Sequence, residues 1–436
     1  MSNEQDQNPP PPESLNSEDL FPDRIGNTVY SKHWIIKILM NIIEACDKVG
    51  ETHKNSVENE ILETDIVELD PKIEEDACAL WDMSVSEEVG KFLLDSGICG
   101  IFLDVVEKTQ SPRLLEIIVG IMANLSTFPP LCSIILENKM LMSSVLLLSG
   151  TSDSPTLIQV MRLIVNGLKH ENSKNLWSEA YGEKSFFKVN VKDILSNSLN
   201  SSVILAVYDL LETTFSENII YTELLGQDSF LEAFIVSGQQ LLKKKECLDK
   251  FFCILNLLCQ YSLNVEKFVN KWNEFKPLFY EYVSNLEIED SLFNSKVLSI
   301  HSYFEAYNTL LSSGLLRKDW VITDKGYLVS VARTSEAVNR LILDVQKHNE
   351  RVLNVPEQNN QDSSERLRHV CVQDGVQSVT MLSQYDFRVW NVLAESILET
   401  AKTLKTFVEK DEEREILNDI LRLSSTNESM DLSIAE

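Results

Sequence analysis

The feature of this sequence that most constrains its fold is a phrase that occurs twice. Residues 111–126 read SPRLLEIIVGIMANLS, and residues 154–169 read SPTLIQVMRLIVNGLK. In both copies six apolar residues lie at i, i+3, i+4, i+7, i+8 and i+11, which is the pattern of an amphipathic α-helix. Ser-Pro precedes the pattern each time, so we expect Ser111 and Ser154 to be the N-caps of two equivalent helices.

Looser copies of the pattern follow along the chain. Their first positions are 114, 157, 204, 250 and 300, so the steps are 43, 47, 46 and 50 residues. A helix with a wide apolar stripe cannot cover that stripe alone, so the copies are expected to stack. Helical repeats of about 40–47 residues are typical of armadillo and HEAT proteins. Two short apolar stretches, 129–138 and 139–150, separate the first two copies, and three helices per repeat favour the armadillo type.

The sequence therefore predicts an all-α protein, an armadillo/HEAT-like right-handed α-solenoid with a disordered acidic N-terminus. An irregular helical bundle is the alternative. Within the array, Ser84 and Glu87 have the spacing of a capping box. The predicted organisation is a disordered tail over 1–24, a capping helix over 25–50 that begins near Ser31, an acidic linker over 51–76, the repeat array over 77–320, and a C-terminal helical region over 321–436 with a flexible loop near 355–366 and a polar tail.

The net charge of the chain limits the kinds of molecule that it is expected to bind. The formal net charge is −28, which disfavours nucleic acid and anionic membrane surfaces. It favours protein partners with a basic patch. No stretch reaches 18 consecutive apolar residues, and no basic start precedes an apolar run, so neither a membrane span nor a secretory signal is expected. Eight cysteines without tight pairs indicate reduced thiols in an intracellular protein.

Motifs for catalysis are absent from the sequence. There is no G-x-x-x-x-G-K-[ST], G-x-G-x-x-G or H-E-x-x-H motif. Cys247, Cys253 and Cys259 are six residues apart, so on one helix they point to different faces and suit a core better than a zinc site. We predict no catalytic residue, no cofactor, no metal ligand and no small-molecule substrate. An intracellular enzyme remains a further alternative.

Asn124 is the first candidate for partner binding. In armadillo proteins that hold extended basic peptides, as importins do, third-helix asparagines bind the peptide backbone and tryptophans one turn earlier flank its side chains. Here Gly120 stands one turn before Asn124, and Gly167 and Thr214 take the matching slots of the next two copies. The ladder is therefore interrupted, and an importin-like receptor is the alternative reading. A helix-end cap, or a hydrogen bond to a neighbouring repeat, is the structural explanation of Asn124.

Tyr30, His33 and Trp34 are the second candidate. They lie where the first helix is expected to begin. The structural explanation is that this helix packs onto the first repeat and caps the array. The functional one is that the three side chains form an aromatic anchor for a partner protein.

Three stretches together carry a resemblance to a known family. IGNTVYSKHW (25–34), CALWDMS (78–84) and PRLLEIIVGIMANLS (112–126) occur in this order. They resemble the serum amyloid A-like family, also called the synoviocyte-proliferation-associated family, over roughly residues 25–170. The resemblance implies an armadillo-like fold, a nuclear location, with the cytoplasm possible, and a non-enzymatic role in promoting cell proliferation. No catalytic residues come with it. The expected function is thus a non-enzymatic intracellular scaffold for protein interaction.

Overall fold

A computed structural model describes residues 23–54, 68–170, 185–216, 228–242 and 245–284, together with single positions between 299 and 313 and between 402 and 418. The chain divides into two units, residues 1–191 and 192–436. The described part of the chain contains helices and no β-strand; a single bridge joins Arg24 to Ser31 and closes the loop before the first described helix.

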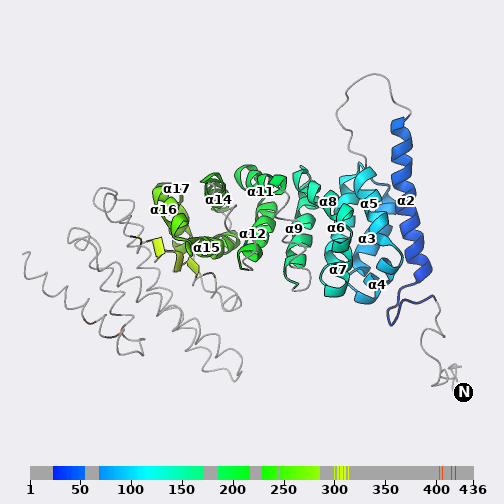
Figure 1. The fold of residues 1–436 in the computed structure, drawn as a ribbon, viewed down its shortest axis with the longest axis horizontal. Helices are drawn as coiled ribbons and strands as arrows, with labels where there is room; N and C mark the ends of the chain where they lie inside the picture. Colours follow the sequence, from blue (N-terminus) through cyan, green and yellow to red (C-terminus); the bar gives the residue numbers. More distant parts are fainter. Residues whose placement is uncertain are drawn as a thin grey trace, which may run out of the picture. The chain divides into compact units, whose positions relative to one another are not determined.

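The first unit is a succession of short helices (Figure 1). Tight turns connect most of them, because Pro or a capping residue begins the next helix soon after the last one ends. The helices are α2 (Lys32–Lys54), α3 (Pro71–Met83), α4 (Glu87–Asp95), α5 (Ile98–Lys108), α6 (Pro112–Leu125), α7 (Pro129–Glu137), α8 (Lys139–Leu147) and α9 (Ser154–Leu168).

These helices pack in three parallel rows. α3 contacts α6 and α6 contacts α9; α2 contacts α5 and α5 contacts α8; α4 contacts α7. Each set of three consecutive helices, α4–α6 and then α7–α9, supplies one helix to every row. α2 and α3 supply the second and third helices of the preceding repeat. This is the arrangement of armadillo repeats, so the expected fold is confirmed, with three helices per repeat.

The repeated phrase forms the row of third helices. All six apolar positions of each copy are buried, which confirms the register of the stripe. In α6 and α9 these residues are Leu114, Ile117, Ile118, Ile121, Met122 and Leu125, followed by Leu157, Val160, Met161, Ile164, Val165 and Leu168. α6 lies between α3 and α9, and nine residues are buried in α6 and nine in α9.

The predicted caps are confirmed at one helix and wrong at two. Ser111 Oγ accepts from the Leu114 amide, as expected. The cap of α9 is Asp153 rather than Ser154, because its carboxylate accepts from the Thr156 amide at 2.9 Å. A carboxylate one residue earlier displaces the serine as the cap.

Ser84 does not form the predicted capping box. It ends α3, and its hydroxyl donates to the Trp81 carbonyl at 2.6 Å. Ser86 is the N-cap residue of α4, without a side-chain hydrogen bond. The hydroxyl of Ser84 is thus used at the C-terminus of the preceding helix.

The second unit repeats the same pairing. The described helices here are α11 (Ser185–Asn197, which spans the border), α12 (Ser201–Ser216), α14 (Asp228–Gln240), α15 (Lys245–Cys259), α16 (Ser262–Asn270) and α17 (Trp272–Ser284). α12 contacts α15, and α14 contacts α17. The third and fourth copies of the pattern lie in α12 and α15, as predicted. Phe252 packs edge-on against Phe279 and Tyr303 in an aromatic core.

The ends of the predicted segments differ from the structure. Asp23 and Arg24 belong to the loop that begins α2, so only residues 1–22 of the predicted tail lie outside the described residues. α2 extends to Lys54 and α3 begins at Pro71, because Asp70 caps it, which shortens the predicted linker from both sides. The predictions for 321–436, including the loop near 355–366, lie outside the described residues apart from four single positions.

No single helix in the described ranges is long and apolar enough to cross a membrane. α7 and the segment Lys139–Gly150 meet the length and composition criteria only when they are joined across a bend of 89°.

Candidate interaction surface

Asp23 organises the loop that carries the first candidate residues. Its carboxylate accepts from the Ser31 hydroxyl and, at 2.8 Å, from the His33 amide. These hydrogen bonds hold the pKa of Asp23 below its usual value. At the tip of the loop the Asn27 amide donates to Glu88 Oε2 of α4 at 2.8 Å. The motif at 25–34 is therefore a cap that fixes the start of α2 against α4.

Tyr30, His33 and Trp34 are positioned by this cap. The Tyr30 carbonyl accepts from the Ile25 amide at 3.0 Å, and Tyr30 is half-buried. His33 is exposed, and Trp34 is 39% exposed. The structural explanation is supported, because the opposite side of α2, with Ile35 and Ile42, is buried.

The outer side of α2 is apolar. Ile36, Met40 and Ile43 are each at least 37% exposed, and they share one face because they lie at i, i+4 and i+7. We call these three residues the α2 apolar face; Trp34, two residues before Ile36, is exposed on another flank of the same helix. α2 lies in the row α2–α5–α8, away from the third helices that carry Asn124, so the structure does not bring the two candidates together.

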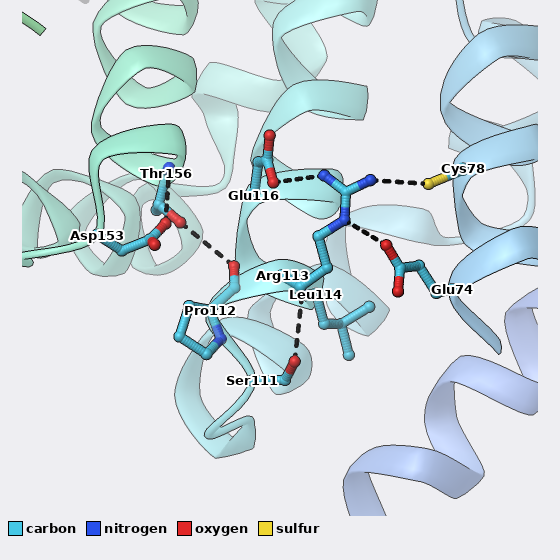
Figure 2. Close-up of polar contacts among 9 residues, drawn as sticks. All are labelled: Glu74, Cys78, Ser111, Pro112, Arg113, Leu114, Glu116, Asp153 and Thr156. Atoms are coloured by element: carbon cyan, nitrogen blue, oxygen red, sulfur yellow. Dashed lines mark hydrogen bonds and ion pairs between the residues drawn. The ribbon is translucent and has the colours of Figure 1, made fainter. Parts of the chain in front are cut away.

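Arg113 joins two of the three stretches that carry the family resemblance (Figure 2). It lies in α6, and its Nε donates to Glu74 Oε1 of α3 at 2.7 Å. Nη1 donates to Glu116 Oε2 at 2.5 Å, and Nη2 to the Cys78 sulfur at 3.3 Å. The two carboxylates raise the pKa of Arg113. The positive charge of Arg113 is therefore balanced by two carboxylates, and its side chain links the third helices α3 and α6.

The indole ring of Trp81 in α3 lies directly against Gly120 in α6, the third helix of the next repeat. A Cβ at Gly120 would stand 2.3 Å from Cε2 and Cζ2 of the indole, so only glycine lets the half-exposed ring lie on α6. Sequence reasoning treated Gly120 as the missing tryptophan of a ladder. The structure supplies an indole at this place from the neighbouring helix α3.

Asn124 is held by both of its neighbouring repeats. Its Nδ2 donates to the Trp81 carbonyl at 3.1 Å and to Ser84 Oγ at 2.8 Å. Its Oδ1 accepts from Arg162 Nη2 at 2.6 Å. The structural explanation of Asn124, a hydrogen bond to a neighbouring repeat, is confirmed. Partner binding by this half-buried residue stays a proposal.

Sequence reasoning missed Arg162 and Asn166, one turn apart on α9. Asn166 Nδ2 donates to the Ala123 carbonyl at 2.8 Å, which repeats the bond from Asn124 to Trp81 at the same separation of 43 residues. Two successive third helices thus carry equivalent asparagines. The asparagines are 42 residues apart in sequence whereas the apolar stripes are 43 apart, so alignment on the stripes placed Gly167 in that slot.

We call Trp81, Asn124, Arg162 and Asn166 the third-helix face. All four are half-buried, and they combine an aromatic ring, amides and a guanidinium, which are groups that bind peptide backbone and side chains.

The described cysteines do not add a nucleophile to this face. Burial raises the pKa of the Cys78 thiol despite the nearby Arg113, and burial also raises the pKa of Cys99 and of Cys253. These residues are therefore thiols at neutral pH, and the thiol is the less reactive form.

The chain is 34% identical to Protein saal1 of Xenopus tropicalis over 212 residues, and 34% identical to Protein SAAL1 of Homo sapiens over 193 residues. The chain is homologous to proteins named SAAL1. The expected resemblance to the serum amyloid A-like proteins is thus confirmed. These matches cover 48% and 44% of this chain and 44% and 40% of the relatives, so the chain spans less than half the length of the SAAL1 proteins it matches.

No family model matches the chain. Among solved structures it is similar to a designed armadillo repeat protein, with 12% identity, 62% of this chain and 99% of that chain covered, and a TM-score of 0.41. It is also similar to a chain from a study of the interaction between cadherin and beta-catenin, with 11% identity, 89% and 82% coverage, and a TM-score of 0.47. The assignment of the fold rests on the three helix rows described above.

Proposed function

We propose that this SAAL1 homologue is a non-catalytic scaffold that binds another protein through the third-helix face. The observation that carries the proposal is the partial exposure of Trp81, Asn124, Arg162 and Asn166 on the successive third helices α3, α6 and α9. Stacked repeats hold these side chains on a rigid support, which lowers the entropy lost when a partner binds.

The wider role is proposed from the resemblance. The resemblance carried by residues 25–34, 78–84 and 112–126 implies an intracellular, nuclear location and a role in promoting cell proliferation, and we propose both for this chain. The net charge of −28 supports a partner with a basic patch and disfavours nucleic acid and membranes.

The exposed part of α2, which comprises Tyr30, His33 and Trp34 at its start and the α2 apolar face after them, is a second place where a partner could bind. It is supported by the exposure of Trp34 and Met40, 39% and 56%. Site-specific photo-crosslinking in cells distinguishes the two surfaces. A photoreactive phenylalanine derivative replaces Trp81 on the third-helix face, Trp34 on α2, or Met140 on α8, which is 67% exposed and serves as the control.

We expect one discrete adduct from position 81 and none from position 140. An adduct from position 34 alone would move the binding surface to α2. Adducts from position 140 alone would contradict both surfaces. Fluorescence imaging of the tagged full chain tests the nuclear location separately, and exclusion from the nucleus would contradict it.

An importin-like receptor for extended basic peptides is a further candidate, because Asn124 and Asn166 do repeat in successive third helices. The amides of both are engaged within the protein. One turn before Asn166 the chain has Arg162 instead of a tryptophan, and a guanidinium repels a basic side chain at that place.

A further inference from the structure

α6 and α9 carry an unusual charge pattern for so acidic a chain. Residues 117–136 contain no charged side chain, and residues 154–170 contain no Asp or Glu but do contain Arg162, Lys169 and His170. Lys169 is exposed and His170 half-buried at the end of α9. A protein with a net charge of −28 therefore carries only positive charge along α9 and its C-terminal end.

Arg162 lies in the middle of α9 and has no counter-ion among the described residues. Its described hydrogen bonds come from Nη2 alone, to the Gly120 carbonyl at 2.9 Å and to Asn124 Oδ1 at 2.6 Å. Both acceptors are neutral. No ion pair of Arg162 with a carboxylate occurs within the described ranges, and its Nε is buried without an acceptor. Partial burial lowers the pKa of this guanidinium, as expected for a desolvated cation without a counter-charge.

Arg113, on the same row of helices, has carboxylates that balance its positive charge. It lies in α6, is also half-buried, and pairs with Glu74 and, three residues away, with Glu116. At the corresponding spacing before Arg162 stands Gln159, whose Oε1 is buried without a donor. Within the described ranges, the charge of Arg113 is thus neutralised by carboxylates, and that of Arg162 is not.

We propose that Arg162 binds a carboxylate side chain of an extended segment of the partner protein, while a peptide group beside it contacts Asn166, whose Nδ2 donates one hydrogen bond within the described residues. The inference rests on the proposed function of the third-helix face. Guanidinium and carboxylate match in charge and geometry, and the surplus negative charge of the rest of the chain selects a segment whose flanking residues are neutral or basic. The segment therefore carries one acidic residue in a non-acidic context.

The experiment selects peptides from a phage-displayed library of random 12-residue sequences on the purified full chain. Selections on Arg162→Gln and on Lys139→Gln are run in parallel; Lys139→Gln removes an exposed positive charge from α8, in another row. We expect wild type and Lys139→Gln to enrich one Asp or Glu at a fixed position, and Arg162→Gln not to. In the best peptide, replacing that residue by its amide weakens binding about tenfold or more for wild type and less than twofold for Arg162→Gln.

Gln159→Glu separates recognition from a purely structural role of Arg162. It keeps the guanidinium and its bonds to α6, and it offers an internal carboxylate three residues before Arg162, one turn along the same helix. We expect this variant to melt at or above the temperature of wild type and to lose the preference for the acidic residue. It also keeps the proposal testable if Arg162→Gln does not fold.

The other possible results of these experiments contradict either the inference on Arg162 or the proposed function. Enriched peptides without a fixed acidic residue, or a preference that Gln159→Glu retains, overturn the inference on Arg162 and leave the scaffold. Enriched peptides with basic residues at that position favour the importin-like alternative and also overturn it. The position-81 crosslink tests the scaffold independently, so its absence contradicts the proposed function whatever the library yields.

Discussion

Gly120 of α6 lies directly against the indole of Trp81 of α3, at a distance that leaves no room for a Cβ atom. The two residues come from the two stretches that, with 25–34, carry the resemblance to the serum amyloid A-like family. Their contact fixes how closely successive third helices approach. It also sets the half-exposed ring beside Asn124, whose amide donates to the Trp81 carbonyl.

Gly120→Ala tests this contact. A methyl group 2.3 Å from the ring forces the indole or the helix to move, so we expect the free energy of unfolding to fall by about 1–3 kcal/mol. Gly100→Ala in α5 is the matched control, because nothing lies within 4 Å of its Cβ. That change should raise stability by about 0.5–1 kcal/mol through helix propensity. Urea unfolding measures both, and equal effects would mean that the ring does not lie on Gly120.

Asn124→Ala and Asn166→Ala differ in the number of hydrogen bonds they remove. The first leaves Trp81 O, Ser84 Oγ and Arg162 Nη2 without their amide partner, whereas the second affects Ala123 O. We expect a loss of about 1–3 kcal/mol for Asn124→Ala and about 1 kcal/mol for Asn166→Ala. Chemical denaturation gives both values. If Asn166→Ala costs more, the ranking and the hydrogen bonds behind it are wrong.

The fold was predictable because the spacing of apolar residues, which can be read from the sequence, determines which side of each helix is buried. The stripes that begin at Leu114 and Leu157 are buried as predicted. The division into three helices per repeat also followed from the Pro and Asn residues that interrupt the apolar stretches. Family motifs located the cap at 25–34, although its hydrogen bond to Glu88 depends on a contact 61 residues away, which no local pattern encodes.

The third-helix face was only partly predictable, because polar contacts between repeats do not follow the apolar register. Asn124 was recognised, but Asn166 was passed over since it is one position out of step with the stripes. Arg162 gave no sequence signal of its own, and its lack of a carboxylate appears only once α6 and α9 are placed together. The Ser84 cap failed for the same reason: its hydroxyl serves α3 and Asn124 at once.

Asp23 makes the stability of the α2 cap dependent on pH. Hydrogen bonds from Ser31 and from the His33 amide depress its pKa below 3.8 in the folded state. A depressed pKa means that the ionised form stabilises the folded state above the unfolded pKa and that this contribution is lost as the pH falls through the folded pKa. Asp23→Asn should therefore destabilise the start of α2 at pH 7, with a difference from wild type that shrinks below about pH 4. Amide hydrogen exchange of α2 across pH measures it; a difference that does not vary with pH would exclude this role of the carboxylate.

Charge outside the described helices is expected to accelerate encounter with a basic partner. Residues 1–76 contain 18 acidic and 6 basic residues, a net of −12 out of −28. Truncation at residue 77 is unsuitable, because it removes α2 and half of α3, which pack on α5 and α6. Deleting 1–22 and replacing the four acidic residues of 55–67 by their amides removes nine carboxylates while the cap at Asp23 and both helices stay intact.

A fluorescent 15-residue lysine-rich peptide should associate several-fold more slowly with this variant than with the full chain in stopped-flow mixing at low salt. The difference should vanish in about 0.5 M salt, because the Debye length falls from ~8 Å at physiological ionic strength to ~3 Å at 1 M. Equal melting temperatures of the two proteins would exclude a change in folding. Association rates that are equal at low salt would show that these carboxylates do not steer the peptide, and the third-helix face would then have to attract its partner through local contacts alone.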